Sequence, residues 1–406
     1  MGNDNYLIGR QPILNRNQEI VAYELLFRSP GSLSAVVEDA SMATASVIIN
    51  TLTEFGLIDI LGGNKGFINL ELELLMDDTL NILPKDHIVI ELLETLKVTD
   101  ELVERCRFLK LGGFTLALDD HEYSPKYHEL YKIVDIVKVD LIQTSTARLE
   151  EMIKHFRDYP LQLLAEKVET LEEFSYCLDL GFDLFQGYYF AKPSIMEKKR
   201  LDDSTSTLLK LMRQLSDDVE LDEIEKTFRK HVSLTYKLLL LVNSVGIGTR
   251  DKIDTVRHGI SMLGRQQIKR WVQLALFAGS DHGGTENPLL EMAAVRAGIM
   301  EELAKQHITL KGHPDSGEKA YMTGILSILE ATYNIPMAEM VCNLNLSEDV
   351  KDALLSRAGG LGKLLHVAEL LEQLEFEHVN LYLDEMGITT EIMLEIQKKA
   401  YAWRRH

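Results

Sequence analysis

From the N-terminus to about residue 195, short runs of β-forming residues alternate with amphipathic segments of helical length. The runs read LIGRQPIL, IVAYELLF, GFINL, HIVIELL, FTLALDD, DIVKVDL, LQLLAEKV and LFQGYYF. Strands separated by connections of helical length favour a parallel sheet, and this many repeats predicts a closed α/β barrel. An open doubly wound sheet is the alternative, but it needs a glycine-rich nucleotide loop after the first strand, and this sequence has none there.

From about residue 203 the pattern changes to long helical periodicities with little strand signal. Examples are STLLKLMRQL, LTYKLLLLVNSV and TTEIMLEIQKKAYAW. The charged stretch MEKKRLDD, which follows Pro193, suits a junction between two domains. We therefore predict a barrel over residues 1–196 and a second, all-helical domain over residues 197–406.

The chain is strongly acidic, with a formal net charge of −20. About three quarters of this charge lies in residues 1–196. Such acidity argues against nucleic acid as a partner, because general affinity for nucleic acid depends on basic patches. A nucleotide can still bind where divalent cations neutralise the carboxylates.

Nothing in the sequence predicts a membrane segment or a secretory signal, because there is no apolar run of about 18 residues or more. The three cysteines, Cys106, Cys177 and Cys342, are far apart and lack metal-ligand spacing. Isolated thiols of this kind are typical of a reducing cytosol, so the predicted location is cytoplasmic.

Polar residues recur where the predicted strands end, and the carboxyl ends of barrel strands share one face. They are Glu24, Asn69, Glu91, Asp119, Asp120, Lys138, Glu166 and Gln186. Carboxylates gathered this closely cannot all be charged unless cations bridge them. Hard oxygen ligands select Mg²⁺ or Mn²⁺ over zinc, although each acid alone is more typical of a helix cap or turn. The set predicts a divalent-cation site, or the remains of one.

The same residues resemble the signature of EAL domains. The family's name-giving Glu-Ala-Leu appears here as Glu24-Leu25-Leu26 within YELLFR. Other motifs follow in the family's order: RQPI, FINLE, IELLE, LALDD, VKVD, AEKVET and FQGYYFAKP. The resemblance covers roughly residues 5–195. It implies a barrel phosphodiesterase that hydrolyses the bacterial second messenger cyclic di-GMP to linear pGpG.

The resemblance also implies roles for these residues. Glu24, Asn69, Glu91 and Asp119 would hold one cation, while Asp119 and Asp120 would face a second, so that a shared water becomes a nucleophile.

Other residues of the resemblance would act on the water and the nucleotide. Glu166 would be a general base or a ligand of the second cation, and Lys138 would orient the water. Glu169 would support them. Three residues would lie near the nucleotide or its phosphates: Gln11, Arg28 and Gln186.

The sequence departs from the family pattern at three places. Leu25 replaces the family's alanine and adds bulk beside Glu24. Lys167 replaces a glycine next to Glu166, where its charge could lower the pKa of that carboxyl. Active EAL domains follow the two aspartates with Phe-Gly and a Gly/Ser-rich loop, whereas this chain has HEYSP at residues 121–125.

This altered loop is the largest of the three departures. We expect it to be stiffer, with His121 exposed and Glu122 adding a carboxylate beside the cations. Slow catalysis, binding of cyclic di-GMP without turnover and a purely structural barrel all stay open. A homodimer through the barrel, which the resemblance also implies, stays open too.

The second half resembles HDOD domains, which are helical relatives of HD phosphohydrolases that lack the paired His-Asp metal ligands. The resemblance rests on KTFRKHVSLTYKLLLLVNSVGIG with Asn243-Ser244, on IDTVRHGISMLGRQQIKRWV with His258, Leu263 and Gly264, and on AYMTGILSILEATYNIP. It implies a regulatory or partner-binding module whose protein partner the sequence does not identify. The alternative for the whole chain is a nucleotide-independent scaffold for protein interactions.

Overall fold

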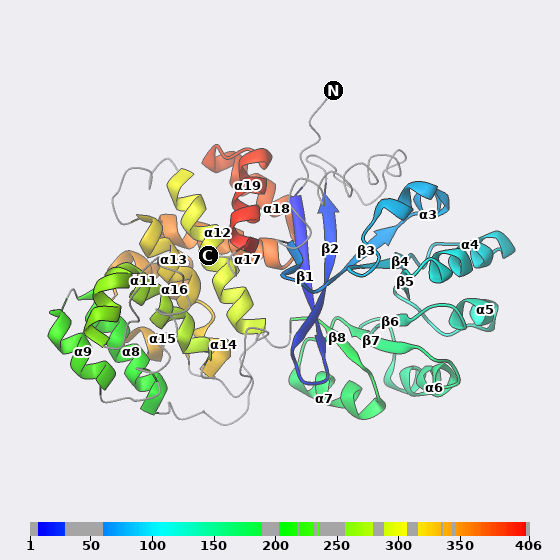
Figure 1. Ribbon diagram of the computed structural model, residues 1–406, viewed down its shortest axis with the longest axis horizontal. Coiled ribbons are helices and arrows are strands. Elements are labelled where there is room, and N and C mark those ends of the chain that lie inside the picture. Colours follow the sequence, from blue (N-terminus) through cyan, green and yellow to red (C-terminus); the bar gives the residue numbers. More distant parts are fainter. Residues whose placement is uncertain are drawn as a thin grey trace.

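The computed structural model describes residues 7–28, 60–188, 203–217, 219–229, 234, 256–278, 288–306, 316–333, 336–342 and 346–402. They form a barrel and a group of helices that lie side by side (Figure 1). The predicted fold class, an α/β barrel followed by an all-helical part, is confirmed. The expected junction before residue 203 and most of LTYKLLLLVNSV lie outside the described residues.

The barrel closes in chain order from β1 to β8. Its strands are β1 (Leu7–Asn15), β2 (Ile20–Arg28), β3 (Lys65–Leu70), β4 (Ile88–Leu92), β5 (Thr115–Leu118), β6 (Ile136–Asp140), β7 (Gln162–Glu166) and β8 (Leu184–Gln186). Helices on the outside are α3 (Leu72–Met76), α4 (Asp100–Leu111), α5 (His128–Tyr131), α6 (Thr146–Phe156) and α7 (Leu171–Leu180).

Strand β1 differs from the expected all-parallel sheet. It is antiparallel to both of its neighbours, β2 and β8, whereas the other neighbouring strands are parallel. The cause is the tight turn after Asn15, whose backbone N–H donates to Glu19 O at 2.9 Å. A turn this short can join only antiparallel strands, since a parallel pair needs a crossover of a dozen or more residues.

The interior of the barrel is closed by a layer of apolar side chains, one from each strand. They are Ile13, Ala22, Phe67, Val89, Ala117, Ile136, Leu164 and Leu184. Successive side chains of a strand point to opposite faces, so the residues two positions away from this layer also point inward. The apolar layer therefore forms a floor on which the next inward-facing layer rests.

The helical part comprises α8 (Asp203–Ser216), α9 (Leu221–Arg229), α11 (Val256–Ala278), α12 (Pro288–Gln306), α13 (Ser316–Leu326), α14 (Leu329–Tyr333), α15 (Met337–Cys342), α16 (Glu348–Ser356), α17 (Gly359–Glu372), α18 (Phe376–Met386) and α19 (Thr390–Tyr401). Helix α12 packs against α13, α17 and α19. Helix α11 bends at Gly264, whose φ is +75°. No helix among the described residues is long and apolar enough to cross a membrane.

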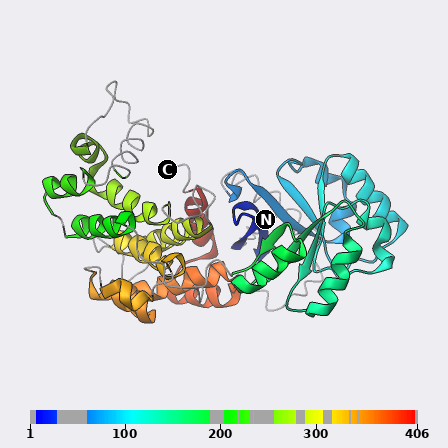
Figure 2. The same cartoon turned by 90° about the horizontal axis from the view of Figure 1, so that it is seen from below.

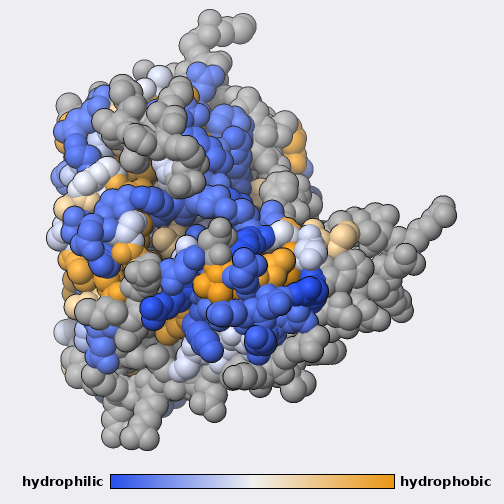
Figure 3. Space-filling model, turned by 90° about the vertical axis from the view of Figure 1, so that its left-hand side faces the viewer, coloured by the Kyte–Doolittle hydropathy of each residue, from blue (hydrophilic) through white to orange (hydrophobic). Residues whose placement is uncertain are grey.

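The two parts meet at the β1–β2 hairpin, which both ribbon views place next to α19 (Figures 1 and 2). Strand β1 contacts α17 and α19. On the opposite end of the helical part, apolar side chains appear in small groups bordered by hydrophilic ones (Figure 3). The barrel thus contacts the helices mainly through β1.

Candidate active site

A polar layer follows the apolar floor of the barrel. Its members each lie two positions along the chain from a floor residue: Gln11, Glu24, Asn69, Glu91, Asp119, Lys138, Glu166 and Gln186. On the reversed strand β1 the step runs backwards, from Ile13 to Gln11, and Gln11 lies opposite Glu24 in the β1–β2 register. The strand period of two residues therefore gathers the residues that the sequence singled out, although Glu24 lies within β2 and not at its end.

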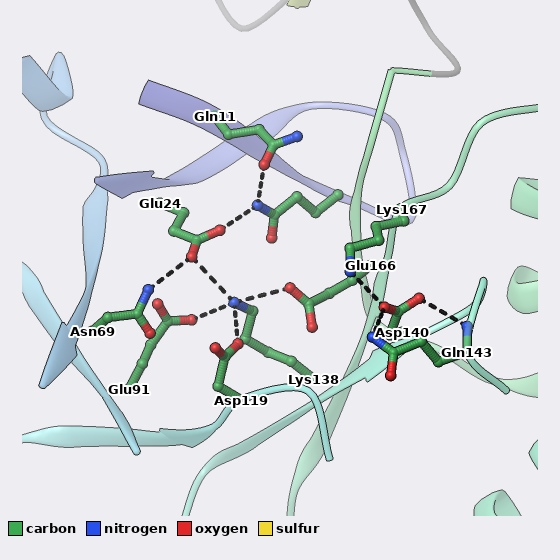
Figure 4. A network of polar contacts seen from close by, with 11 residues as sticks. Gln11, Glu24, Asn69, Glu91, Asp119, Lys138, Asp140, Gln143, Glu166 and Lys167 are labelled. Carbon is green, nitrogen blue, oxygen red and sulfur yellow. Dashed lines mark hydrogen bonds and ion pairs between the residues drawn. The ribbon is translucent and has the colours of Figure 1, made fainter. Parts of the chain in front are cut away.

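Lys138 lies at the centre of this layer (Figure 4). Its Nζ is 2.6 Å from Glu91 Oε1 and from Asp119 Oδ1. Glu166 Oε1 and Glu24 Oε1 lie 3.0 and 3.5 Å from the same nitrogen. The lysine is fully buried, and burial alone would lower its pKa, but the surrounding carboxylates raise the pKa of Lys138 well above its usual value.

Four carboxylates face the single positive charge of Lys138. Burial raises the pKa of Glu91 well above its usual value, raises the pKa of Asp119, and raises the pKa of Glu166 to about 8. Burial also opposes ionisation of Glu24, but Lys138 and two donated hydrogen bonds keep the pKa of Glu24 below its usual value. One ammonium therefore leaves part of the layer protonated near neutral pH.

Amide side chains hold Glu24 on its other sides. Asn69 Nδ2 donates to Glu24 Oε1 at 3.1 Å, and Gln186 Nε2 donates to Glu24 Oε2 at 2.5 Å. Gln186 Nε2 also donates to Gln11 Oε1 at 2.7 Å. The resemblance placed Gln11 and Gln186 near a nucleotide, and the structure connects Gln186 directly to Glu24 and connects Gln11 to Glu24 through Gln186.

Several buried oxygens in and beside the layer accept no hydrogen bond from any described residue: Asn69 Oδ1, Glu91 Oε2, Asp120 Oδ1 and Glu166 Oε2. A buried acceptor without a donor costs free energy, and a hard cation supplies what it lacks. Among the described side chains, no three acids, histidines or cysteines are already arranged around a metal position. The reason is that the carboxylates turn toward Lys138. The oxygen ligands present thus fit a divalent cation, provided that these carboxylates turn from Lys138 toward it.

Lys167 pairs with Asp140 and not with its neighbour Glu166. It has a φ of +57°, the left-handed conformation that favours the family's glycine. Its Nζ lies 2.5 Å from Asp140 Oδ2 (Figure 4). The expected lowering of the pKa of Glu166 is wrong, because burial outweighs the neighbouring cations and raises it. Asp140 had no role predicted from the sequence, and its oxygens also accept from Gln143.

The expectation of an exposed His121 is wrong. The side chain is 4% exposed, and its Nε2 lies 2.8 Å from Tyr131 Oη. Its backbone N–H donates to Lys138 O at 2.8 Å, and its ring packs edge-on against Tyr127. Burial lowers the pKa of His121 to about 4. The ring therefore anchors the loop as a neutral side chain.

The rest of the altered loop turns away from the acids. Glu122 is exposed and lies 3.8 Å from Arg148 Nη2, so it adds no carboxylate to the polar layer. Tyr123 stacks on His155 with ring centroids 4.4 Å apart. Pro125 starts a short 3₁₀ helix, Pro125–Tyr127. The loop is thus held by aromatic packing.

The remaining predicted residues lie at or beyond the edge of the layer. Asp120 follows Asp119 with a left-handed φ of +39°. Glu169 is exposed after β7. Arg28 ends β2, and its side chain lies outside the described part of the chain. Leu25 is buried at 1% exposure, so its extra bulk is part of the core.

Comparisons with known proteins agree with this architecture. The sequence matches the EAL domain model over residues 9–193 and the HDOD domain model over residues 201–344. It is 31% identical over 403 residues to the cyclic di-GMP phosphodiesterase CdgJ of Vibrio cholerae. The alignment covers 98% of this chain and 91% of that protein.

Two further similarities span different shares of the chain. The protein YuxH of Bacillus subtilis is 29% identical over 374 residues, or 90% of each protein. A standalone EAL protein from Vibrio cholerae O395, solved in its c-di-GMP bound form, is 28% identical with a TM-score of 0.39, and the match covers 48% of this chain and 94% of that one. The two domain matches and the full-length relative show that the chain belongs to the family of proteins in which an EAL domain is followed by an HDOD domain.

Proposed function

We propose that this chain is a bacterial signalling protein that binds cyclic di-GMP at the polar layer and hydrolyses it to linear pGpG with Mg²⁺ or Mn²⁺. The observation that carries the proposal is the set of buried oxygens without donors beside a cluster of carboxylates. A protein that used its barrel only as a scaffold would gain stability by replacing such a cluster with apolar residues. Similarity to CdgJ, a cyclic di-GMP phosphodiesterase, supports the same assignment.

The cations would be held by oxygen ligands of the layer. Glu24, Asn69, Glu91 and Asp119 are assigned to one cation, and Asp119 with Asp120 to a second. When bound, such cations lower the pKa of water and stabilise charge on the attacking and leaving oxygens. Binding would also draw protons off Glu91 and Asp119, because a ligand carboxylate must be ionised.

Lys138 and Glu166 are assigned to the water and its proton. The ammonium group of Lys138 holds four carboxylates close together and offsets their negative charge. Glu166 would accept the proton of the water that attacks phosphorus, while the bond from phosphorus to the ribose oxygen breaks. Bound cations would lower the pKa of Glu166, which is about 8 without them, so that its carboxylate could accept this proton near neutral pH.

Gln11, Gln186 and Arg28 are assigned to the dinucleotide. The first two are joined by a hydrogen bond at the edge of the layer, and Gln186 Oε1 is buried without a donor among the described residues. That oxygen can accept from an amine or imide of a guanine base. We assign residues 1–196 to this binding unit and residues 197–406 to a regulatory unit with a protein partner.

The test is to incubate the purified full chain with cyclic di-GMP and Mn²⁺ and to measure both binding and pGpG. Glu24→Ala should abolish product release, whereas Glu104→Gln, on the exposed surface of α4, should not change it. Equal product from wild type and Glu24→Ala would disprove catalysis. No binding at high micromolar dinucleotide with cation present would disprove the proposal as a whole.

A second candidate is a cyclic di-GMP sensor that binds without turnover. The observation that favours it is the loop after β5, which is fixed by His121 and Tyr123 in place of a glycine-rich segment. Grafting a Gly/Ser-rich segment over residues 121–125 separates the two candidates. Higher turnover with unchanged binding would show that the loop limits catalysis.

A further inference from the structure

We infer that the helical part positions Gln11 and Gln186 through two polar contacts, the buried ion pair of Arg10 with Glu291 and the part-buried hydrogen bond of Tyr188 with Glu372. Arg10 and Tyr188 would be positioning residues that act on the ligand through the two glutamines. The inference rests on the proposed function only for the identity of the ligand. It makes the affinity of the barrel for its dinucleotide a property of the whole chain.

The first contact uses the alternation of side chains along β1. Gln11 points into the barrel opposite Glu24, so its neighbour Arg10 points out toward the helices. Arg10 Nη2 lies 2.6 Å from Glu291 Oε1 of α12, and both side chains are less than a tenth exposed. The guanidinium therefore forms a buried ion pair that links β1 to α12.

The guanidinium of Arg10 is fixed on its other sides as well. Its Nη1 donates to Ile60 O at 2.5 Å. Its carbon lies 4.2 Å from the ring centroid of Tyr23 in the barrel and 4.3 Å from that of Tyr401 in α19. Such a stacked and paired guanidinium has one orientation, which fixes the backbone beside Gln11.

The second contact follows β8. Tyr188, two residues after Gln186, donates from its hydroxyl to Glu372 Oε2 of α17 at 3.4 Å. Glu372 is held in turn by Arg296, whose Nε donates to Glu372 Oε1 at 2.8 Å. Between Gln186 and Tyr188, Gly187 lies so close to Val168 that a Cβ would collide with its backbone. A shift at Tyr188 is therefore passed on to Gln186.

The two contacts converge on the same pair of side chains. Gln11 and Gln186 hydrogen bond to each other at 2.7 Å, so each one limits the orientation of the other. Both contacts border one cavity of about 60 Å³, which Gln11 also lines. The helical part thus reaches the polar layer from two strands that are neighbours in the barrel.

A simple adhesive interface would not need buried charges here. Breaking a buried ion pair is strongly destabilising, whereas an apolar surface of the same shape gives equal or greater stability. The interface already contains apolar contacts, since Gly9 lies against Leu374 and Phe376. The ion pair of Arg10 and the hydrogen bond of Tyr188 are directional. They constrain the backbone one residue before Gln11 and two residues after Gln186.

The experiment compares Glu291→Gln and Tyr188→Phe with wild type in the full chain with Mn²⁺. Both replacements keep the shape of the side chain and remove one polar contact. The matched control is Glu301→Gln, which breaks the Arg270–Glu301 pair between α11 and α12 within the helical part. Affinity is read as KM where pGpG forms and as Kd where the dinucleotide only binds. The amount of active protein is read as kcat where pGpG forms and as binding stoichiometry where the dinucleotide only binds.

We expect Glu291→Gln to raise KM or Kd roughly five- to tenfold, the lower range of coupling between sites, with kcat or stoichiometry unchanged. Glu301→Gln should leave the affinity at the wild-type value. In a Gln11→Ala background, Glu291→Gln should have no further effect, because the residue through which Arg10 acts is gone. A general loss of stability predicts the opposite pattern, a lower kcat or stoichiometry at unchanged affinity, and that result would overturn the inference.

Failure of the proposed function gives a different result. If wild type binds no cyclic di-GMP, that function is disproved, and amide exchange then decides the inference alone. Faster exchange at residues 184–188 as well as 7–15 in Glu291→Gln, but not in Glu301→Gln, would support positioning by the helices. Unchanged exchange at residues 184–188 would refute it.

Discussion

Glu166 is buried at 7% exposure beside other acids, and its pKa of about 8 lies far above its ordinary value of 4.5. A group whose pKa is raised by folding holds its proton in the folded chain and loses it in the unfolded chain over the interval between the two values. The polar layer therefore opposes folding increasingly as the pH rises through this interval. Divalent cations bound beside Glu166, as proposed above, would remove the opposition, because they would stabilise the ionised carboxylate.

The first prediction concerns this pH dependence. Between pH 5 and 8 the Tm of wild type should fall relative to the Tm of Glu166→Gln, because the glutamine has no proton to lose. Saturating Mn²⁺ should reduce the difference between the two curves. Calorimetry over this range gives the measurement, and parallel curves without cation would contradict the prediction.

The second prediction concerns Lys167. Its pair with the buried Asp140 is half exposed and contributes about 1 kcal/mol or less, while its left-handed backbone costs about 1 kcal/mol that glycine avoids. Lys167→Gly should therefore leave Tm nearly unchanged. It should also tighten Mn²⁺ binding several-fold, because a cation that interacts with Asp120 and Glu166 is removed.

Titration calorimetry with Mn²⁺ tests the prediction for Lys167. Lys132→Met is the control, because Lys132 is exposed and pairs with the exposed Glu129. Equal Mn²⁺ affinity in wild type and Lys167→Gly would show that this lysine does not restrict the cation.

At the scale of elements, the sequence predicted the polar layer because the strand period and the motif order both act locally. Asn69, Glu91 and Lys138 each follow an apolar residue by two positions in their own strand, so no distant contact was needed to find them. The antiparallel direction of β1 was missed, because the pattern of alternation is the same for both directions. The tight turn after Asn15 was the signal that could have shown it.

The loop after β5 shows what local reasoning could not predict. His121 was expected to be an exposed loop residue because the set of oxygen ligands was complete without it, yet it is buried against Tyr131 and Phe156. These partners lie in α5 and α6, and only the folded barrel brings them to the loop. A histidine that finds a hydroxyl partner can be buried in the neutral state, and its sequence neighbours do not reveal this.

The third prediction concerns the crossing of β8 and the loop after β7. Gly187 has a φ of +152° and no space for a Cβ next to Val168. Gly187→Ala should destabilise the fold by about 3 kcal/mol or more, because backbone must move against backbone. The matched control is Gly63→Ala, which has a φ of +91° and open space, and which should cost only about 1 kcal/mol. Denaturant titrations compare the two, and equal losses would contradict the prediction.

At the scale of the whole molecule, the interface between the parts is built from residues distant in sequence. Gln397 of α19 donates from Nε2 to Ile8 O of β1 at 2.7 Å, and Arg10 pairs with Glu291. The hydrophobic pattern of neither part reveals these contacts. Two domains could therefore be predicted from the sequence, but the interface between them could not.

The fourth prediction is that the full chain unfolds in one cooperative transition. Separating the parts would break the buried Arg10–Glu291 ion pair and expose Phe376, which is 6% exposed in the folded chain. That cost should prevent either part from melting alone. The calorimetric and van't Hoff enthalpies should then agree, and two resolved transitions would contradict the prediction.

The two faces of β1 have a consequence for exchanging domains between relatives. Residues of β1 that face inward, such as Gln11 and Ile13, match the barrel, whereas the side chain of Arg10 matches Glu291, which lies 281 positions later in the chain. A chimera cut between the two domains would join an N-terminal strand to helices that it does not fit. The outward-facing residues of β1 therefore need to be transplanted together with the C-terminal half, as if they were a detached piece of it.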